Sequence, residues 1–322
     1  MPLPTGVQVH VDVPLTNISI AYIQKNNNNP FGYVADRVFP VVPVAKRSDK
    51  YYKYNKGDWF RGGSKPRGPA TPSAGGGFRL STDDYSAVVW ALHDDIAWQD
   101  RANQDSVLDL DADASEWISQ QMLIDREVEW SGKYLAPGVW ANNVTGTTDF
   151  VKWSNYTTGD PAKDIETGKV YIEMTTGFTP NTLVVTRDVH AALKFHPMVK
   201  DQYKHTSSDS ITPAMLAKVF EIDRYMVCGG IKNSGQEEGA DSFDFVQKNK
   251  ALLVYSAPSP SLRRPSGGYT FAWTGYMGAP YAAPSIERFD MREIKATRIE
   301  GEMAYVHKMV AADMGYLMQS VV

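Results

Sequence analysis

Residues 50–60 read KYYKYNKGDWF, and residues 61–77 continue as RGGSKPRGPATPSAGGG. The first stretch is rich in tyrosine and has the β-propensity of a strand, whereas the second is rich in glycine and proline and favours a loop. A second strand-like stretch starts at Phe78 and runs towards Val89. Residues 46–87 are therefore predicted to form a long β-hairpin with a polar tip.

The expected length of this hairpin implies that it extends beyond the body of the protein. A strand of roughly a dozen residues spans about 40 Å, whereas a compact chain of this size has a radius of gyration near 20 Å, on the order given by chain-length scaling. An isolated two-stranded ribbon is only marginally stable in water. Its aromatic residues therefore need a partner surface, and the simplest partner is a neighbouring copy of the same chain. These residues are Tyr52, Tyr54, Trp59 and Phe60.

The hairpin region is also basic, with Arg61, Lys65 and Arg67 close to its tip. Interleaved aromatic and basic residues are compatible with nucleic-acid binding. We favour a charged arm that docks on an acidic surface of a neighbouring copy, because complementary charges guide such contacts. The expected acidic surface comprises Asp125, Glu127 and Glu129.

Residues about 109–135 are predicted to form a long helix. Acidic residues at 109, 111 and 113 favour a helix N-terminus, and Asp113 with Glu116 fits an acidic form of the capping box. Pro137 and Gly138 favour termination. The helix would be about 40 Å long and would act as a structural strut. Its expected apolar face comprises Ala114, Trp117, Gln121, Ile124 and Val128, widened by Ile118 and Met122.

The rest of the sequence divides into segments that differ in composition and in their pattern of apolar residues. Prolines at 2, 4, 14, 30, 40 and 43 indicate an extended N-terminal arm over residues 1–45. Residues 139–180 are rich in turn-forming residues, and an α/β pattern starts at Pro180. Residues 286–317 are predicted to form an antiparallel pair that turns at Gly301. The elements expected in the α/β part are strands at 183–185, 224–228 and 251–255 and helices at 188–195 and 212–219.

The composition argues against several classes of protein. The 322-residue chain has a formal net charge of −4 and carries no long Lys/Arg run, so specific binding of nucleic acid is not expected. A single cysteine, Cys228, allows no intrachain disulfide and fits a reducing compartment. No basic-then-apolar leader and no apolar stretch of roughly 20 residues is present, so neither a signal peptide nor a membrane span is predicted.

Motifs for chemistry are weak. Residues 109–113 open like a calcium loop, but Ala114 replaces the required glycine and Gln120 the required glutamate. The histidines show no H-E-x-x-H spacing, and the phosphate-loop and G-x-S-x-G patterns are absent from the sequence. We therefore predict no catalytic residue, no metal site and no cofactor. Two alternatives remain: a cytoplasmic hydrolase with an α/β core in residues 180–256, and a polysaccharide-binding β module.

Several stretches resemble one protein family over nearly the whole chain, and most specifically over residues 35–140. The stretches are Phe39-Pro40-Val41-Val42-Pro43-Val44, Lys50-Tyr51-Tyr52-Lys53-Tyr54, Gly57-Asp58-Trp59-Phe60, Arg79-Leu80-Ser81-Thr82, Ala91-Leu92-His93 and Arg101-Ala102-Asn103. With the order of hairpin and long helix, they resemble the major capsid proteins of tailed bacteriophages, which have the Hong Kong 97-type fold. Another phage structural protein, such as a tail or decoration component, is the main alternative.

The resemblance implies an α+β fold with named parts. Residues 1–45 would be the N-terminal arm and 46–87 the extended E-loop hairpin, which lies on an adjacent subunit. Residues 88–180 would form a peripheral domain that contains the spine helix, at about 109–135. Residues 181–280 would form an axial domain, and 281–322 would return to the peripheral domain as strands.

The resemblance also implies a function and partners. The chain would self-assemble into pentamers and hexamers that form the icosahedral head shell around double-stranded DNA, without binding that DNA sequence-specifically. The expected partners are a separate scaffolding protein and a portal protein, with a decoration protein left open. The protein would be assembled in the bacterial host cytoplasm and would reside in the virion capsid, as a structural protein and not an enzyme.

Overall fold

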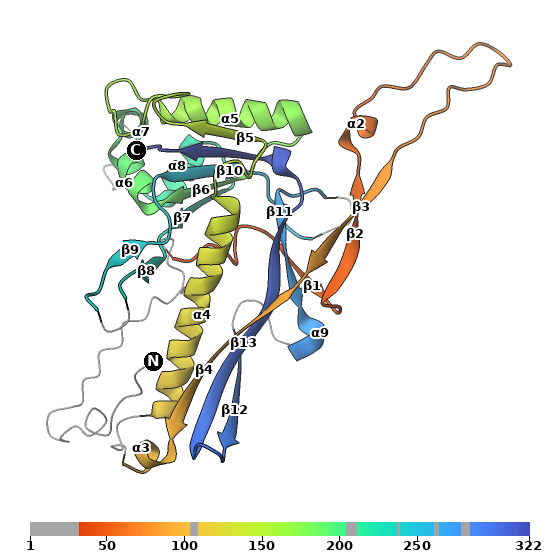
Figure 1. Cartoon of the computed structure of the whole chain (residues 1–322). Helices are drawn as coiled ribbons and strands as arrows, with labels where there is room; N and C mark the ends of the chain where they lie inside the picture. The colour runs from red at the N-terminus through yellow and green to blue at the C-terminus, as the bar shows by residue number, and fades with distance from the viewer. Residues whose placement is uncertain (1–31, 104–108, 204–210, 237–238, 261–263, 278–283) are drawn as a thin grey trace.

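The computed structural model describes residues 32–103, 109–203, 211–236, 239–260, 264–277 and 284–322. Two five-stranded sheets lie at different levels of the molecule, and one long helix, α4 (Leu110–Tyr134), joins them. A two-stranded hairpin projects from the body (Figure 1). The fold is α+β, as predicted.

Helix α4 confirms the predicted spine helix, with a different cap and a shifted face. Its N-cap is Asp109, whose side chain accepts a hydrogen bond from the Ala112 N–H, so the predicted capping box at Asp113 is wrong. Asp113 lies in the first turn, where its charge favours the positive end of the helix dipole. The buried face is centred on Ile118 and Met122, one position away from the predicted stripe.

The first sheet packs against the N-terminal half of α4. Its strands run in the order β1-β11-β13-β12, and β4 pairs with β13. Ile118 and Met122 of the helix contact a cluster that includes Ile299 and Met303 of β13. The strand bounds are β1 (Val41–Val44), β4 (Val88–Ala97), β11 (Gly268–Trp273), β12 (Ser285–Met291) and β13 (Ala296–Met309).

The antiparallel pair predicted near the C-terminus is β12 with β13, but Gly301 is not its turn. The chain turns at residues 292–295, and Gly301 pairs with Ile286 in the middle of β13. A glycine is needed at this position for packing, because a Cβ on residue 301 would lie only 2.5 Å from Ile118 Cγ2. The glycine therefore lets the spine helix approach the sheet closely.

The second sheet receives the C-terminal end of α4 on one face and several helices on the other. Trp130 and Tyr134 of α4 pack with Leu252 and Leu317, whereas the opposite face carries Leu183 and other core residues under the helices. The strand order is β5-β14-β10-β6-β7. The bounds are β5 (Asn142–Thr145), β6 (Thr182–Thr186), β7 (Arg224–Cys228), β10 (Lys250–Val254), β14 (Gly315–Gln319), α5 (Pro161–Thr176), α6 (Arg187–Phe195) and α8 (Pro213–Val219).

The turn-rich interpretation of residues 139–180 is wrong for much of that stretch. Helix α5 begins after Asp160, whose side chain accepts the Lys163 N–H, and Pro161 occupies the first turn. Strand β5 pairs in parallel with β14. The second sheet thus contains β5 and β14 and is contacted by α5, whereas β11 belongs to the first sheet.

The E-loop hairpin is present but its ladder is short. Strands β2 (Ser48–Tyr54) and β3 (Leu80–Ser86) pair from Ser48↔Ser86 to Tyr54↔Leu80. Seven residues span roughly 23 Å, less than the expected limb. The ladder ends because Asn55 caps a short helix, α2 (Lys56–Trp59), by accepting the Gly57 N–H. The loop beyond α2 extends away from the body (Figure 1).

The last part of the predicted arm is buried in the chain's own core. Glu127 Oε2 accepts the backbone N–H groups of Val34 and Ala35, both at 2.9 Å. The Arg224 guanidinium donates to the carbonyl oxygens of Arg37 and Val38, both at 3.0 Å. Residues 1–31 of the predicted arm lie outside the described residues. The smaller elements are α3 (Trp98–Asn103), α7 (Pro197–Tyr203), β8 (Ile231–Asn233), β9 (Phe243–Phe245), α9 (Thr274–Met277) and η2 (Ala312–Met314).

Candidate inter-subunit contact surface

The base of the E-loop hairpin is fixed to the first sheet by aromatic and charged contacts. Tyr85 stacks on Phe271 with ring centroids 4.4 Å apart. Tyr51 also contacts Phe271 and donates its hydroxyl to Asp83 Oδ2 at 2.9 Å. Burial and the Asp83 carboxylate raise the pKa of Tyr51, so the hydroxyl remains a donor. The direction in which the hairpin leaves the body is thus set by packed side chains.

A second anchor lies farther along the hairpin and reaches the other sheet. Lys56 of α2 forms an ion pair with Asp313 of η2. The Phe60 ring lies against Gly177, the left-handed C-cap of α5, where a Cβ would be 3.0 Å from the ring. Only the loop beyond Phe60 projects without such support.

An aromatic cluster stands exposed where the projecting loop begins. Tyr54, Trp59 and Phe78 have ring centroids 5.6–6.0 Å apart. Trp59 and Phe78 are 62% and 60% exposed, so the cluster excludes little water. Exposed aromatic groups of this kind mark interaction surfaces. The sequence identified Tyr54 and Trp59 but missed Phe78, whose only signal was its position directly after a glycine run.

The other two predicted aromatic residues behave differently. Tyr52 is exposed on the ladder, 63% accessible, outside the aromatic cluster. Phe60 is 66% exposed although one edge of its ring touches Gly177. Both are available for contact with another molecule.

The tip of the hairpin carries positive charge without an acidic counterpart on the same loop. Arg61, Lys65 and Arg67 are exposed, and no Asp or Glu occurs between residues 61 and 78. Arg79 differs, because it binds both Asp58 carboxylate oxygens, at 3.0 and 3.1 Å. This contact holds the pKa of Asp58 below its usual range. The predicted basic residues thus form a basic tip, defined here as Arg61, Lys65 and Arg67, whose charge is offset only at Arg61, by the nearby Asp58 carboxylate.

The predicted acidic docking surface on the spine helix requires correction. Glu127 is fully buried, where it binds the Val34 and Ala35 N–H groups and accepts the Cys228 Sγ–H at 3.3 Å. Burial raises the pKa of its carboxyl. It cannot contact another subunit, because residues 33–39 and the second sheet cover this side of the helix.

The two other acidic residues of that predicted surface also separate. Glu129 is half-buried, with Oε2 3.4 Å from Nε2 of the buried His307. Burial raises the pKa of Glu129 to about 7 and lowers that of His307 to about 3, so both groups are mainly neutral between these two pH values. Asp125 alone of the three is exposed.

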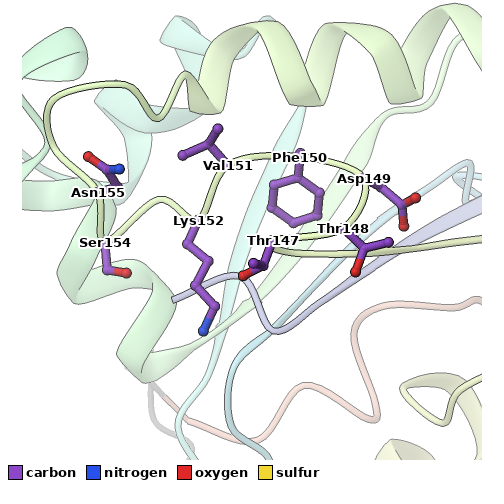
Figure 2. Close-up of a pocket in the computed structure, with 8 residues that line it drawn as sticks. All are labelled: Thr147, Thr148, Asp149, Phe150, Val151, Lys152, Ser154 and Asn155. Carbon is purple, nitrogen blue, oxygen red and sulfur yellow. The ribbon is translucent and has the colours of Figure 1, made fainter.

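A hollow in the surface is lined by one loop that precedes α5. Figure 2 shows its lining side chains, which are Thr147, Thr148, Asp149, Phe150, Val151, Lys152, Ser154 and Asn155. The two charged groups bind their own chain: Asp149 Oδ2 accepts the Thr145 N–H, and Lys152 Nζ donates to the Val322 carbonyl. The hollow therefore follows from the curl of one loop and brings together no nucleophile and base.

Among the described residues, no group of three or more His, Cys, Asp or Glu side chains is placed to hold a metal ion. No helix in the same part of the chain is long and apolar enough to cross a membrane.

Two sheets bridged by a spine helix, with a projecting hairpin, form the Hong Kong 97-type fold of phage shell proteins. The capsid structure of cyanophage P-SCSP1u shares this fold, with a TM-score of 0.61 and 8% identity over 96% of this chain and 92% of that chain. A crystal structure of a phage-related protein from Bordetella bronchiseptica RB50 is more similar, with a TM-score of 0.67 and 26% identity over 90% and 92% of the two chains.

In sequence, this chain is similar to phage major capsid proteins. The major capsid protein of Burkholderia phage BcepMu is 24% identical over 319 residues, which cover 97% of this chain and 96% of that protein. No protein-family model matches the chain. These similarities confirm the resemblance to tailed-phage major capsid proteins that the sequence indicated.

Proposed function

We propose that this chain is the major capsid protein of a tailed phage and assembles as pentamers and hexamers into a closed head shell around double-stranded DNA. The observation that carries the proposal is the projecting E-loop hairpin with its exposed aromatic cluster and basic tip. Near full-length similarity to a phage major capsid protein supports it. The role is structural and not catalytic.

The projecting part of the hairpin has few contacts with its own subunit. Its ladder has only two strands, and its aromatic cluster is largely solvated in the isolated chain. Burying one such side chain against a partner contributes roughly 1.5–3 kcal/mol. When the hairpin of one copy contacts a different surface on the next copy, the interface is heterologous. Repeated heterologous interfaces form a closed ring if the rotation between successive copies permits closure. Rings of five and six copies are the capsomers of the proposed shell.

The proposed partners and location follow from this role. A scaffolding protein and a portal protein would guide assembly in the bacterial host cytoplasm, and a decoration protein could attach to the finished capsid of the virion. A net charge of −4 supports a shell that encloses DNA without gripping it specifically.

The proposal is tested by expressing the chain and imaging the purified product by negative-stain electron microscopy. Closed shells or ring-shaped capsomers are expected. The double variant Trp59→Ser/Phe78→Ser should keep the subunit folded and reduce shell yield at least tenfold. Val170→Ser, at an apolar position of α5 that is 55% exposed, is the matched control and should assemble normally. A wild-type protein that remains a monomer under all assembly conditions contradicts the proposal.

A further inference from the structure

The first sheet has a second face that no described helix covers. Gly301 and Met303 of β13 point to α4, so the even-numbered residues of this strand point to the opposite side. Glu300 and Glu302 lie on this outer face, and Glu287 of β12 is directly opposite Glu300. Phe289, 41% exposed, lies two residues beyond Glu287 on the same face. We call these four residues the acidic sheet face.

The three carboxylates form no ion pair within the described part of the chain, and the Arg298 charge on the same face offsets Glu300 only in part, because Arg298 is paired with Asp95. Arg298, the nearest basic residue on the strand, binds both oxygens of Asp95, at 2.7 and 2.8 Å. No ion pair joins Glu287, Glu300 or Glu302 to a described cation. Burial, together with the charges of Glu300 and Glu287, raises the pKa of Glu302. Like charges directly opposite on neighbouring strands destabilise a sheet, so a cation from outside the subunit would relieve this crowding.

The basic tip of the E-loop hairpin has the complementary charge but lies too far away to reach this face in the same subunit. Figure 1 shows the tip at one end of the molecule and β12, with the lower half of β13, at the other. Because the basic tip and the acidic sheet face lie at opposite ends of the subunit, their opposite charges favour contact between successive copies. Such a contact is heterologous and generates rings or lattices, not isolated dimers.

We propose that the acidic sheet face receives the basic tip of the E-loop hairpin from a second copy of this chain. The inference rests on the proposed function and specifies the surface that completes the contact. Glu287, Glu300 and Glu302 bind Arg61, Lys65 and Arg67, while Phe289 packs beside the glycine- and proline-rich loop. This surface takes the place of the spine-helix surface that the burial of Glu127 excludes.

Charge reversal with rescue tests the pairing. The variants are Lys65→Glu/Arg67→Glu, Glu287→Lys/Glu300→Lys, and all four changes together. Each double variant should lower the fraction of protein that sediments as shells at least tenfold, and the four-fold variant should recover at least half of the wild-type fraction. Glu173→Lys/Asp201→Lys, at exposed positions of α5 and α7, is the charge-matched control and should assemble normally. Double variants that assemble like wild type overturn the proposal.

Zero-length carbodiimide crosslinking of wild-type shells tests the contact without any substitution. The reagent joins a lysine amine to a carboxylate in direct contact, so Lys65 should link to Glu287, Glu300 or Glu302, in shells and not in dissociated subunits. Links from Lys65 only to Asp125 or to other acidic residues overturn the proposed face while the coat function stands. A wild-type chain that forms no shells overturns the proposed function, and this inference with it.

Discussion

Gly301 of β13 lies directly under Ile118 of the spine helix, with no room for a side chain between them. The contact occurs where the N-terminal half of α4 crosses the first sheet, so it sets how closely these two elements pack. Because α4 packs on both sheets, the distance between α4 and β13 also affects the position of the two sheets relative to each other.

Gly301→Ala should therefore destabilise the subunit. A Cβ 2.5 Å from Ile118 Cγ2 forces the helix or the strand to shift, at a cost of about 1–3 kcal/mol for an overpacked core. Urea unfolding of dissociated subunits measures this loss in the free energy of unfolding. Gly132→Ala in the same helix is the control, because nothing lies within 4 Å of its Cβ, and it should gain up to about 1 kcal/mol. Equal effects at both positions would contradict the close packing.

Glu127 should matter for stability and not for docking. Glu127→Ala removes the acceptor of the Val34 and Ala35 N–H groups, and each buried donor left unpaired costs about 1–3 kcal/mol. Glu127→Gln keeps one acceptor oxygen and should lose less. Hydrogen exchange over residues 33–38 should rise in the alanine variant, and unchanged protection there would refute the assigned role.

The stability of the subunit should carry a pH dependence that originates at Glu129. Burial raises its folded pKa from 4.5 to about 7, so between these values the folded protein holds a proton that the unfolded chain has released. The contribution is fully present below pH 4.5 and is lost as the pH rises through 7. His307 acts in the opposite sense: its pKa falls from 6.5 to about 3, so its contribution is present above pH 6.5 and lost as the pH falls towards 3.

Glu129→Gln separates the two effects. The stability of wild type minus that of this variant should decrease between pH 4.5 and 7, because the His307 contribution is common to both proteins. Urea midpoints at several pH values provide the measurement. A difference that stays constant over this range would contradict the raised pKa of Glu129.

The Cys228 thiol should be unreactive in the folded subunit. It is buried and its pKa is raised, first by burial and then by the adjacent Glu127 charge. The reactive species is the thiolate, so labelling should require unfolding or local opening and should be at least about a hundredfold slower than in urea. Rapid labelling of the native protein by a thiol reagent would show that residues 33–39 do not cover this region.

The sequence carried the local features of the fold well. The acidic start and apolar period of α4 predicted its length to within one residue at each end, and the helix predicted at 212–219 is α8. Helix α5 was missed because Gly168 lies within a stretch rich in turn residues. Its position depends on close packing against Tyr316 and Leu253, because a Cβ at Gly168 would lie 3.0 Å from the Tyr316 ring and 3.2 Å from the Leu253 side chain. That contact is not local and leaves no pattern in the sequence.

In the candidate contact surface, too, features set by the local sequence were predictable and features set by long-range contacts were not. Exposed aromatic residues on a ribbon were predictable, since a two-stranded element cannot bury them. The burial of Glu127 could not be predicted from the sequence, because its partners Val34 and Ala35 precede it by more than ninety residues. The acidic sheet face likewise depends on the register that places Glu287 opposite Glu300, which the predicted turn at Gly301 would have excluded.

Cryo-electron microscopy of the assembled wild-type protein tests the central claim most directly. Closed shells are predicted in which residues 46–87 of each copy rest on the next, with the aromatic cluster at Tyr54, Trp59 and Phe78 buried between copies. A soluble single subunit whose hairpin folds back over its own sheets, or shells in which this cluster remains in solvent, would contradict the account.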